Sequence, residues 1–113
     1  MSKENLQELE IRLKSFADAR DWVKFHTPKN LAMALSVEVA ELVEIFQWMT
    51  PEESSKATND PQLAVAIKDE LADVMLYLVR LSSMLEVDLV AEAHSKINRN
   101  EGRFPIGSNK FAH

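Results

Sequence analysis

Hydrophobic residues recur every three or four positions along most of the chain, which is the spacing of one face of an α-helix. The pattern predicts four helices, over residues 3–20, 27–49, 60–85 and 88–101. The longest hydrophobic stripe belongs to the third of them and comprises Leu63, Ile67, Leu71, Val74, Leu78, Leu81 and Leu85. The pattern therefore predicts an all-α fold in which these stripes face other helices.

The starts of the predicted helices are marked by capping residues and by prolines, which fit the first helical turn. A capping side chain stands directly before a proline at Thr27-Pro28, Thr50-Pro51 and Asp60-Pro61. Asp88 can cap the last helix. The signal at Thr50 predicts one short turn, which is followed by a polar loop over residues 54–59.

Short connections between the predicted helices favour antiparallel neighbours. Glycine occurs only at Gly102 and Gly107, so the rest of the chain has few sites for the φ > 0 turns of a hairpin sheet. We expect an antiparallel bundle of about four helices, one domain over residues 1–113, with 104–113 as a flexible tail. Because the leucine-rich stripes are long for 113 residues, the core is expected to be shared between subunits.

Composition narrows the classes of partner. The formal net charge is −5 at pH 7, which disfavours binding to a nucleic-acid backbone. The absence of cysteine excludes disulfides and thiolate chemistry. The first residues are polar with no apolar signal core, and no stretch approaches the roughly 18 consecutive apolar residues of a membrane span. We therefore expect a cytoplasmic protein that binds neither nucleic acid nor membrane.

Two pairs of acidic residues interrupt the hydrophobic faces. Glu38 and Glu41 fall in the second predicted helix, and Glu70 and Asp73 in the third. Each pair is spaced i, i+3, so its carboxylates lie on one side of the helix. If the two helices pack antiparallel, four carboxylates converge, and a divalent cation would offset their repulsion. Oxygen ligands favour Mg²⁺, with Mn²⁺ as a substitute. The alternative is that these acids are simply solvated.

The acidic signature Glu38-x-x-Glu41 followed by Glu70-x-x-Asp73 resembles that of the all-α MazG-like nucleotide pyrophosphohydrolases. The surrounding sequence resembles the dCTP pyrophosphatase branch of that family, over roughly residues 5–105. The segments that carry this second resemblance are Arg20-Asp-Trp22, Phe25-His26-x-Pro28-x-Asn30, Phe46-Gln-Trp48, Tyr77-Leu-Val, and Lys96-Ile-x-x-x-Asn100 with Arg103.

The resemblance implies an enzyme that hydrolyses (deoxy)nucleoside triphosphates, dCTP and related pyrimidine nucleotides first, to a monophosphate and pyrophosphate. It implies that Glu38, Glu41, Glu70 and Asp73 are catalytic and hold Mg²⁺ on the triphosphate. It also implies a homodimer or homotetramer. Cleansing of the nucleotide pool is the expected role, with removal of modified nucleotides as the open alternative. Which glutamate acts as the base, and which phosphorus is attacked, stays open.

Lys96, Asn100 and Arg103 are candidates for binding the phosphates. Their steps of four and three place them on one face if the last helix reaches Arg103. Arginine binds phosphate as a fork and lysine as a point charge. The alternative is a solvated basic end of a helix, which the helix dipole also favours.

Five residues are candidates for a nucleobase pocket: Trp22, His26, Asn30, Trp48 and Tyr77. Aromatic faces stack on bases, and His or Asn can read a polar edge. His26 and Asn30 have the alternative role of bracing the helix that starts beside them. Three phenylalanines are expected in the core, namely Phe16, Phe25 and Phe46.

Two non-enzymatic hypotheses stand beside the hydrolase. One is a metal-binding or regulatory bundle that keeps the acidic cluster without turnover. The other is an acidic oligomerisation module with no site. Metal binding separates these two from each other, and turnover separates the hydrolase from both.

Overall fold

The computed structural model describes residues 5–107, and every regular element within them is helical. The elements are α1 (Leu6–Ala19), the 3₁₀ turn η1 (Val23–Phe25), α2 (Pro28–Phe46), α3 (Pro51–Ser55), the 3₁₀ turn η2 (Ala57–Asn59), α4 (Pro61–Met84) and α5 (Leu89–Arg103). The all-α prediction is confirmed. The predicted polar loop instead contains the end of α3 and η2, and residues 108–113 of the predicted tail lie outside the described residues.

The predicted capping signals operate as expected. The Thr27 hydroxyl accepts a hydrogen bond from the Asn30 N–H at the start of α2. Thr50 and Glu53 exchange side-chain and backbone hydrogen bonds, which forms a capping box at α3. The carboxylates of Asp60 and Asp88 cap α4 and α5 by accepting hydrogen bonds from backbone N–H groups of the first turn. These caps satisfy backbone N–H groups that a helix cannot pair internally, and so they fix where each helix begins.

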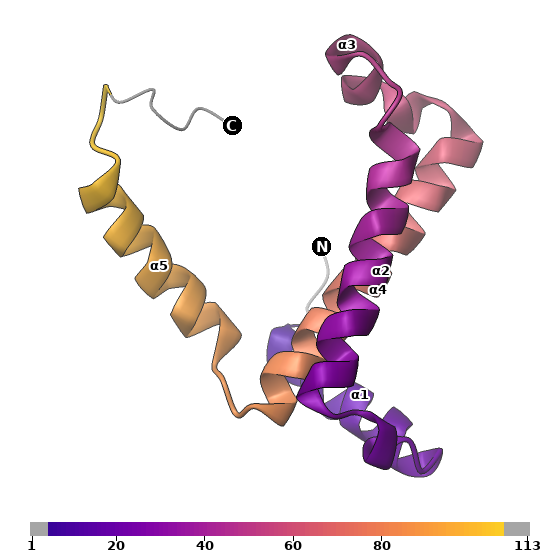
Figure 1. Cartoon of the computed structure of the whole chain (residues 1–113), viewed down its shortest axis with the longest axis vertical. Coiled ribbons are helices and arrows are strands. Elements are labelled where there is room, and N and C mark those ends of the chain that lie inside the picture. The colour runs from indigo at the N-terminus through magenta and orange to yellow at the C-terminus, as the bar shows by residue number, and fades with distance from the viewer. Residues whose placement is uncertain (1–4, 108–113) are drawn as a thin grey trace.

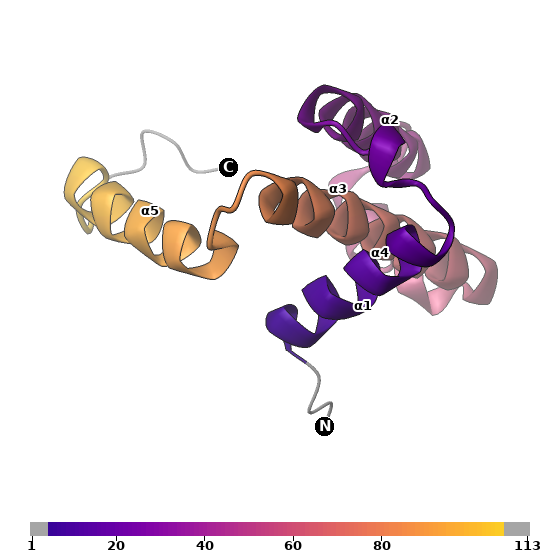
Figure 2. The ribbon, with the colours of Figure 1, turned by 90° about the horizontal axis from the view of Figure 1, so that it is seen from below.

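The long helices α2 and α4 lie side by side and run antiparallel (Figure 1). The short helices α3 and η2 reverse the chain between them, and α1 lies across the other end of α4 (Figures 1 and 2). The two largest fully buried side chains are Leu31, near the start of α2, and Val79, near the end of α4. The core therefore sits where α1, α2 and α4 meet.

Helix α5 stands apart from the rest of the bundle in both views (Figures 1 and 2). The radius of gyration is 17.0 Å, whereas a compact domain of this length has about 13 Å. The accessible surface is 9042 Å², against about 6,300 Å² for a compact monomer of this mass. A single chain thus leaves much of its helical surface uncovered.

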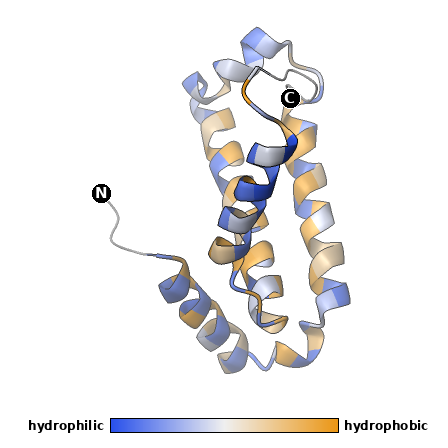
Figure 3. Cartoon of the chain, turned by 90° about the vertical axis from the view of Figure 1, so that its left-hand side faces the viewer, coloured by the Kyte–Doolittle hydropathy of each residue, from blue (hydrophilic) through white to orange (hydrophobic). Residues whose placement is uncertain are grey.

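The predicted stripe on the third helix is divided in the structure. Ile67 is buried, but Leu71, Leu78 and Leu85 are exposed in the single chain. Hydrophobic residues recur along the long helices, whereas α5 is largely hydrophilic (Figure 3). Phe16 and Phe25, expected in the core, are also exposed. No helix among the described residues is long and apolar enough to cross a membrane.

Two helices end in a left-handed residue that is not glycine. Asp21, after α1, has φ of 55°, and Glu86, after α4, has φ of 56°. Behind Glu86, the N–H of Val87 donates to the carbonyl of Ser82, the bond of a Schellman motif. Left-handed turns therefore form here without glycine. The left-handed conformation costs a non-glycine residue about 1–2 kcal/mol, and the hydrogen bond of the Schellman motif offsets that cost.

Candidate active site

Three of the four predicted acids come together between α2 and α4. Glu38, Glu41 and Glu70 each place one carboxylate oxygen within 4.8 Å of the others, and these three residues are called the carboxylate cluster below. The i, i+3 spacing on α2 turns Glu38 and Glu41 toward α4, as predicted. Asp73 follows Glu70 by one helical turn. It acts on Glu38 through its charge but stands at the edge of the cluster, where it lines an adjacent cavity.

Two members of the carboxylate cluster, Glu38 and Glu70, retain protons more strongly than isolated carboxyl groups do. A hydrogen bond with Glu38, followed by loss of hydration and by the proximity of Glu41, raises the pKa of Glu70 to about 7. The same hydrogen bond favours the ionised form of Glu38, but loss of hydration and the carboxylate of Glu41 outweigh it and raise the pKa of Glu38 as well. Loss of the last proton from the Glu38–Glu70 pair is therefore less favourable than from an isolated carboxyl group.

The carboxylate cluster fits a divalent cation. The Oε2 atoms of Glu38 and Glu70 are buried, and neither has a hydrogen-bond partner in the described part of the chain. Neither of the ion pairs that the described residues form involves the cluster. Buried carboxylate oxygens without partners are costly, and an oxygen-liganded ion of the Mg²⁺ type removes that cost.

A cavity of about 160 Å³ lies beside the carboxylate cluster, between α4 and the segment that runs from α1 to α2. Three predicted base-pocket residues line it, Trp22, His26 and Tyr77. Its other walls are Asp73, Arg80, Phe16 and the aliphatic side chains Leu13, Ala17, Leu31 and Leu76. These residues define the aromatic cavity.

The turn after α1 positions the aromatic wall of this cavity. Asp21 adopts its left-handed conformation, and the Trp22 N–H donates to the carbonyl of Ala17 at 3.0 Å. The Trp22 ring then packs edge-on against Phe16, with ring centroids 5.5 Å apart. The Arg20 guanidinium lies 3.6 Å from the centroid of the Phe16 ring, a cation–π contact that covers its outer face. Phe16 is thus a wall residue, not the core residue expected from its spacing.

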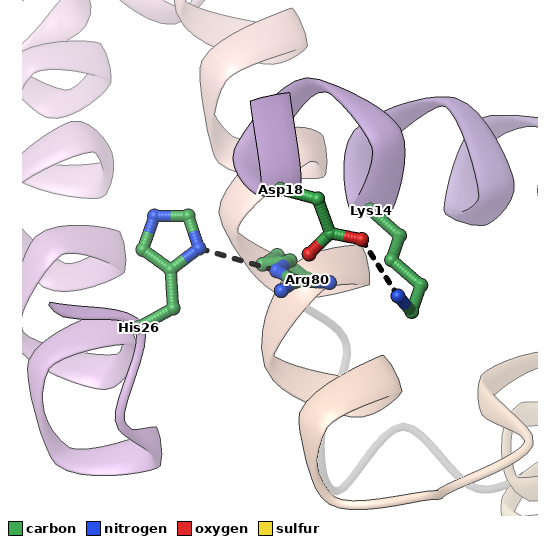
Figure 4. Close-up of polar contacts among 4 residues, drawn as sticks. All are labelled: Lys14, Asp18, His26 and Arg80. Atoms are coloured by element: carbon green, nitrogen blue, oxygen red, sulfur yellow. Dashed lines mark hydrogen bonds and ion pairs between the residues drawn. The ribbon is translucent and has the colours of Figure 1, made fainter. Parts of the chain in front are cut away.

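The side chains of His26 and Arg80 point toward each other (Figure 4), and both line the aromatic cavity. The Nε–H of Arg80 donates to Nδ1 of His26 at 3.2 Å. Burial and, secondarily, the charge of Arg80 lower the pKa of His26, so the imidazole stays neutral with its proton on Nε2. Sequence reasoning missed Arg80. The available signal was a charged residue inside the apolar run Tyr77-Leu-Val-Arg80-Leu.

Two other predicted pocket residues lie outside the aromatic cavity of this chain. The side-chain amide of Asn30 donates to the carbonyl of Phe25 at 3.1 Å, which braces the start of α2. Trp48 follows the end of α2 and is 88% exposed. Neither is among the residues that line the cavity.

The predicted phosphate-binding residues are all on α5, which extends to Arg103 as their shared face requires. Lys96 is exposed and Asn100 half-buried, and the Arg103 guanidinium lies 5.1 Å from the centroid of the Phe104 ring. Because α5 stands apart from α2 and α4, the single chain does not bring these residues to the carboxylate cluster (Figure 1).

Comparison with known proteins places this arrangement in a family. The sequence profile of the MazG-like family matches residues 33–111, which include all four predicted acids. The chain belongs to the MazG-like family. This MazG-like chain is 41% identical over 100 residues to human dCTP pyrophosphatase 1 and 38% identical over 105 residues to the bovine protein.

These alignments cover 88% and 93% of the MazG-like chain, but 59% and 62% of the two mammalian proteins. The chain thus spans about three fifths of the length of these relatives. A crystal structure of a pyrophosphatase from Archaeoglobus fulgidus superposes with a TM-score of 0.83 at 37% identity, covering 93% of this chain and 96% of that one. The fold of the MazG-like chain is therefore shared along nearly its whole length.

Proposed function

We propose that this MazG-like protein is a Mg²⁺-dependent nucleoside triphosphate pyrophosphohydrolase, acting on dCTP and related pyrimidine nucleotides. The observation that carries the proposal is a carboxylate cluster with two unpaired buried oxygens, next to a cavity lined by aromatic side chains. The names of the mammalian and archaeal relatives support the same reaction class. Cytoplasmic cleansing of the nucleotide pool is the role that we propose for a single domain of this kind.

Glu38, Glu41, Glu70 and Asp73 would hold the Mg²⁺, with Mn²⁺ as a substitute. When bound, the ion would neutralise phosphate charge and lower the pKa of the attacking water. A carboxylate of the cluster that is not engaged with the ion would accept the proton of that water. Cleavage between the α- and β-phosphates then releases a monophosphate and pyrophosphate.

The aromatic cavity would hold the base, with Trp22 and Tyr77 stacking on the ring and His26 at its polar edge. Stacking on one aromatic ring contributes about 1–3 kcal/mol and is tolerant of base identity. Trp48 and Asn30, which do not line this cavity, would contact the nucleotide only from another copy of the chain or after rearrangement.

We propose that a second copy completes the site, in a homodimer or homotetramer. On α5, the apolar residues Leu89, Ala93 and Ile97 recur at steps of four beside the face of Lys96, Asn100 and Arg103. Packing of this apolar stripe on the exposed leucines of another chain's α4 would cover both surfaces. It would also carry the three polar residues toward the phosphates held at that chain's carboxylate cluster.

The test is turnover of a panel of dCTP, dTTP, dUTP, dATP and CTP by the purified protein with Mg²⁺, with products separated by ion-exchange chromatography. We expect dCMP and intact pyrophosphate, with the highest kcat/KM for dCTP. A diphosphate with orthophosphate would indicate a different reaction class. Mg²⁺ binding without turnover of any triphosphate would favour the non-catalytic metal-binding bundle, and absence of both would favour the oligomerisation module.

A further inference from the structure

Arg80 is a buried cation with unused hydrogen-bond donors in the wall of the aromatic cavity. The residue is 5% exposed. Its Nε–H bonds to His26, and no carboxylate of the described residues forms an ion pair with it. A guanidinium has five N–H donors, so the four on its two terminal nitrogens lack a protein partner there. No Arg80 nitrogen is among the buried side-chain atoms without a partner, so these donors are open to the cavity, where a ligand can supply the acceptors.

The planar guanidinium selects the chemistry of that ligand. Its parallel N–H groups match two adjacent acceptor atoms in one plane. The edge of a cytosine ring offers such a pair, the unprotonated N3 and the O2 carbonyl. In uracil and thymine, N3 carries a hydrogen and would face the guanidinium donor to donor. An arginine at this position therefore distinguishes cytosine from the other pyrimidines by the protonation state of one ring atom.

We propose that Arg80 is the specificity-determining residue of the site, donating two parallel hydrogen bonds to N3 and O2 of a cytosine ring held in the aromatic cavity. This inference rests on the proposed function, since it assumes a nucleotide substrate, and deepens it by assigning the choice of base to one side chain. His26 is a positioning residue, because its Nδ1 accepts from Nε of Arg80 and fixes the plane of the guanidinium.

The size and place of the cavity agree with this assignment. A cavity of about 150 Å³ accommodates a benzene ring, so 160 Å³ suits a six-membered pyrimidine ring better than a purine. Arg80 follows Glu70 by ten residues on the same helix, an axial distance of about 15 Å. That separation is comparable with the distance from the base edge of a nucleotide to its phosphates, and Asp73 lies between the two ends.

The experiment compares kcat/KM for dCTP, dUTP and 3-deaza-dCTP, which replaces the N3 acceptor by C–H. A good bidentate contact to a base favours the correct base over a wrong one by about 5- to 150-fold. The kcat/KM of the wild type is therefore expected to be lower by that factor on 3-deaza-dCTP and on dUTP than on dCTP. Arg80→Met should lower kcat/KM for dCTP by a similar factor. Its kcat/KM for 3-deaza-dCTP should then equal its kcat/KM for dCTP. Arg80→Lys, which keeps the charge without the fork, should restore little. Arg12→Met, at an exposed arginine of α1, is the matched control and should behave as wild type.

Two results would overturn the assignment: an unchanged ratio of dCTP to dUTP in a folded Arg80→Met protein, or equal wild-type rates on dCTP and 3-deaza-dCTP. The second comparison needs no variant, so it remains decisive if Arg80→Met loses helicity by circular dichroism. If no triphosphate is hydrolysed, the proposed function fails separately. Calorimetric titration with dCMP and dUMP then tests Arg80 alone. Tighter binding of dCMP that disappears in Arg80→Met supports the assignment, and equal affinities overturn it.

Discussion

Nδ1 of His26 accepts a hydrogen bond from Nε of Arg80, which lies 54 positions later in the sequence. The contact joins the segment before α2 to the last third of α4, and both side chains line the aromatic cavity. It requires a neutral imidazole, because a protonated His26 has no acceptor and would place two cations together.

The pH dependence of stability should report this contact. The pKa of His26 is lowered in the folded protein, so the unfolded chain binds more protons near pH 6. The contribution is therefore present above the unfolded pKa of about 6.5 and is lost as the pH falls below it. We expect the Tm of wild type to fall more steeply between pH 7 and 5.5 than that of His26→Gln. His94→Gln, at an exposed histidine of α5, should keep the wild-type slope. Identical slopes in all three proteins would contradict the prediction.

Substitution of Glu70 should separate catalysis from folding. Glu70→Gln removes a carboxylate from the cluster and keeps the size of the side chain, so turnover with Mg²⁺ should fall by more than about 100-fold, the upper range for outer-shell groups. In metal-free buffer the same variant should unfold at a higher temperature than wild type, since repulsion with Glu38 and Glu41 is reduced. Steady-state kinetics and thermal melts measure the two effects. Near-normal turnover would remove Glu70 from the proposed metal site.

Helix α5 is expected to mediate assembly. Ile97 is half exposed on its apolar stripe, whereas the neighbouring Asn98 points away from that stripe. Ile97→Asp should reduce the particle mass measured by light scattering and reduce activity with it. Asn98→Asp introduces the same charge on the same helix and should preserve both properties. A wild-type protein that is monomeric at micromolar concentration would remove the basis of this prediction.

Trp48 provides a separate test of the base contacts. It is 88% exposed in the single chain, so Trp48→Ala should leave the free energy of unfolding of the monomer nearly unchanged. If another copy uses this ring for stacking, kcat/KM should fall alike for dCTP, dTTP and dATP, by about 5- to 150-fold. A drop confined to dCTP would instead make Trp48 a selective contact, and no drop would exclude it from the site.

Glu86 offers a prediction about stability alone. Its φ of 56° suits glycine, and Glu86→Gly should raise the free energy of unfolding by up to about 1 kcal/mol. Lys68→Gly, at an exposed position inside α4, should lower it by about 1 kcal/mol, because glycine there only adds conformational freedom to the unfolded chain. Urea denaturation of both variants measures the contrast. Destabilisation by Glu86→Gly would show that its side chain stabilises the end of α4.

Helix periodicity and capping chemistry predicted the elements well, because both act over a few neighbouring residues. Thr27, Asp60 and Asp88 cap the helices that their positions predicted. The i, i+3 spacing also predicted that Glu38 and Glu41 would turn toward Glu70, as they do.

Long-range contacts were harder to predict. Nothing in the local pattern of Phe16 distinguishes a cavity wall from a core position, and the partner of Arg80 lies on a different segment. The stripe of α4 predicts one apolar face, and Leu71, Leu78 and Leu85 on it are exposed in the single chain. Periodicity gives the side of a helix that is apolar but not the element that covers it.

The continuity of α4 has a mechanical consequence. One uninterrupted helix, without internal glycine or proline, carries Glu70, Asp73, Tyr77 and Arg80. The distances between these residues are therefore fixed by the helix geometry. The opposite wall of the aromatic cavity is positioned instead by the left-handed turn at Asp21, between α1 and η1. We therefore expect any adjustment to ligands of different shape to fall on the α1–η1 wall, while the spacing between Glu70 and Arg80 stays fixed.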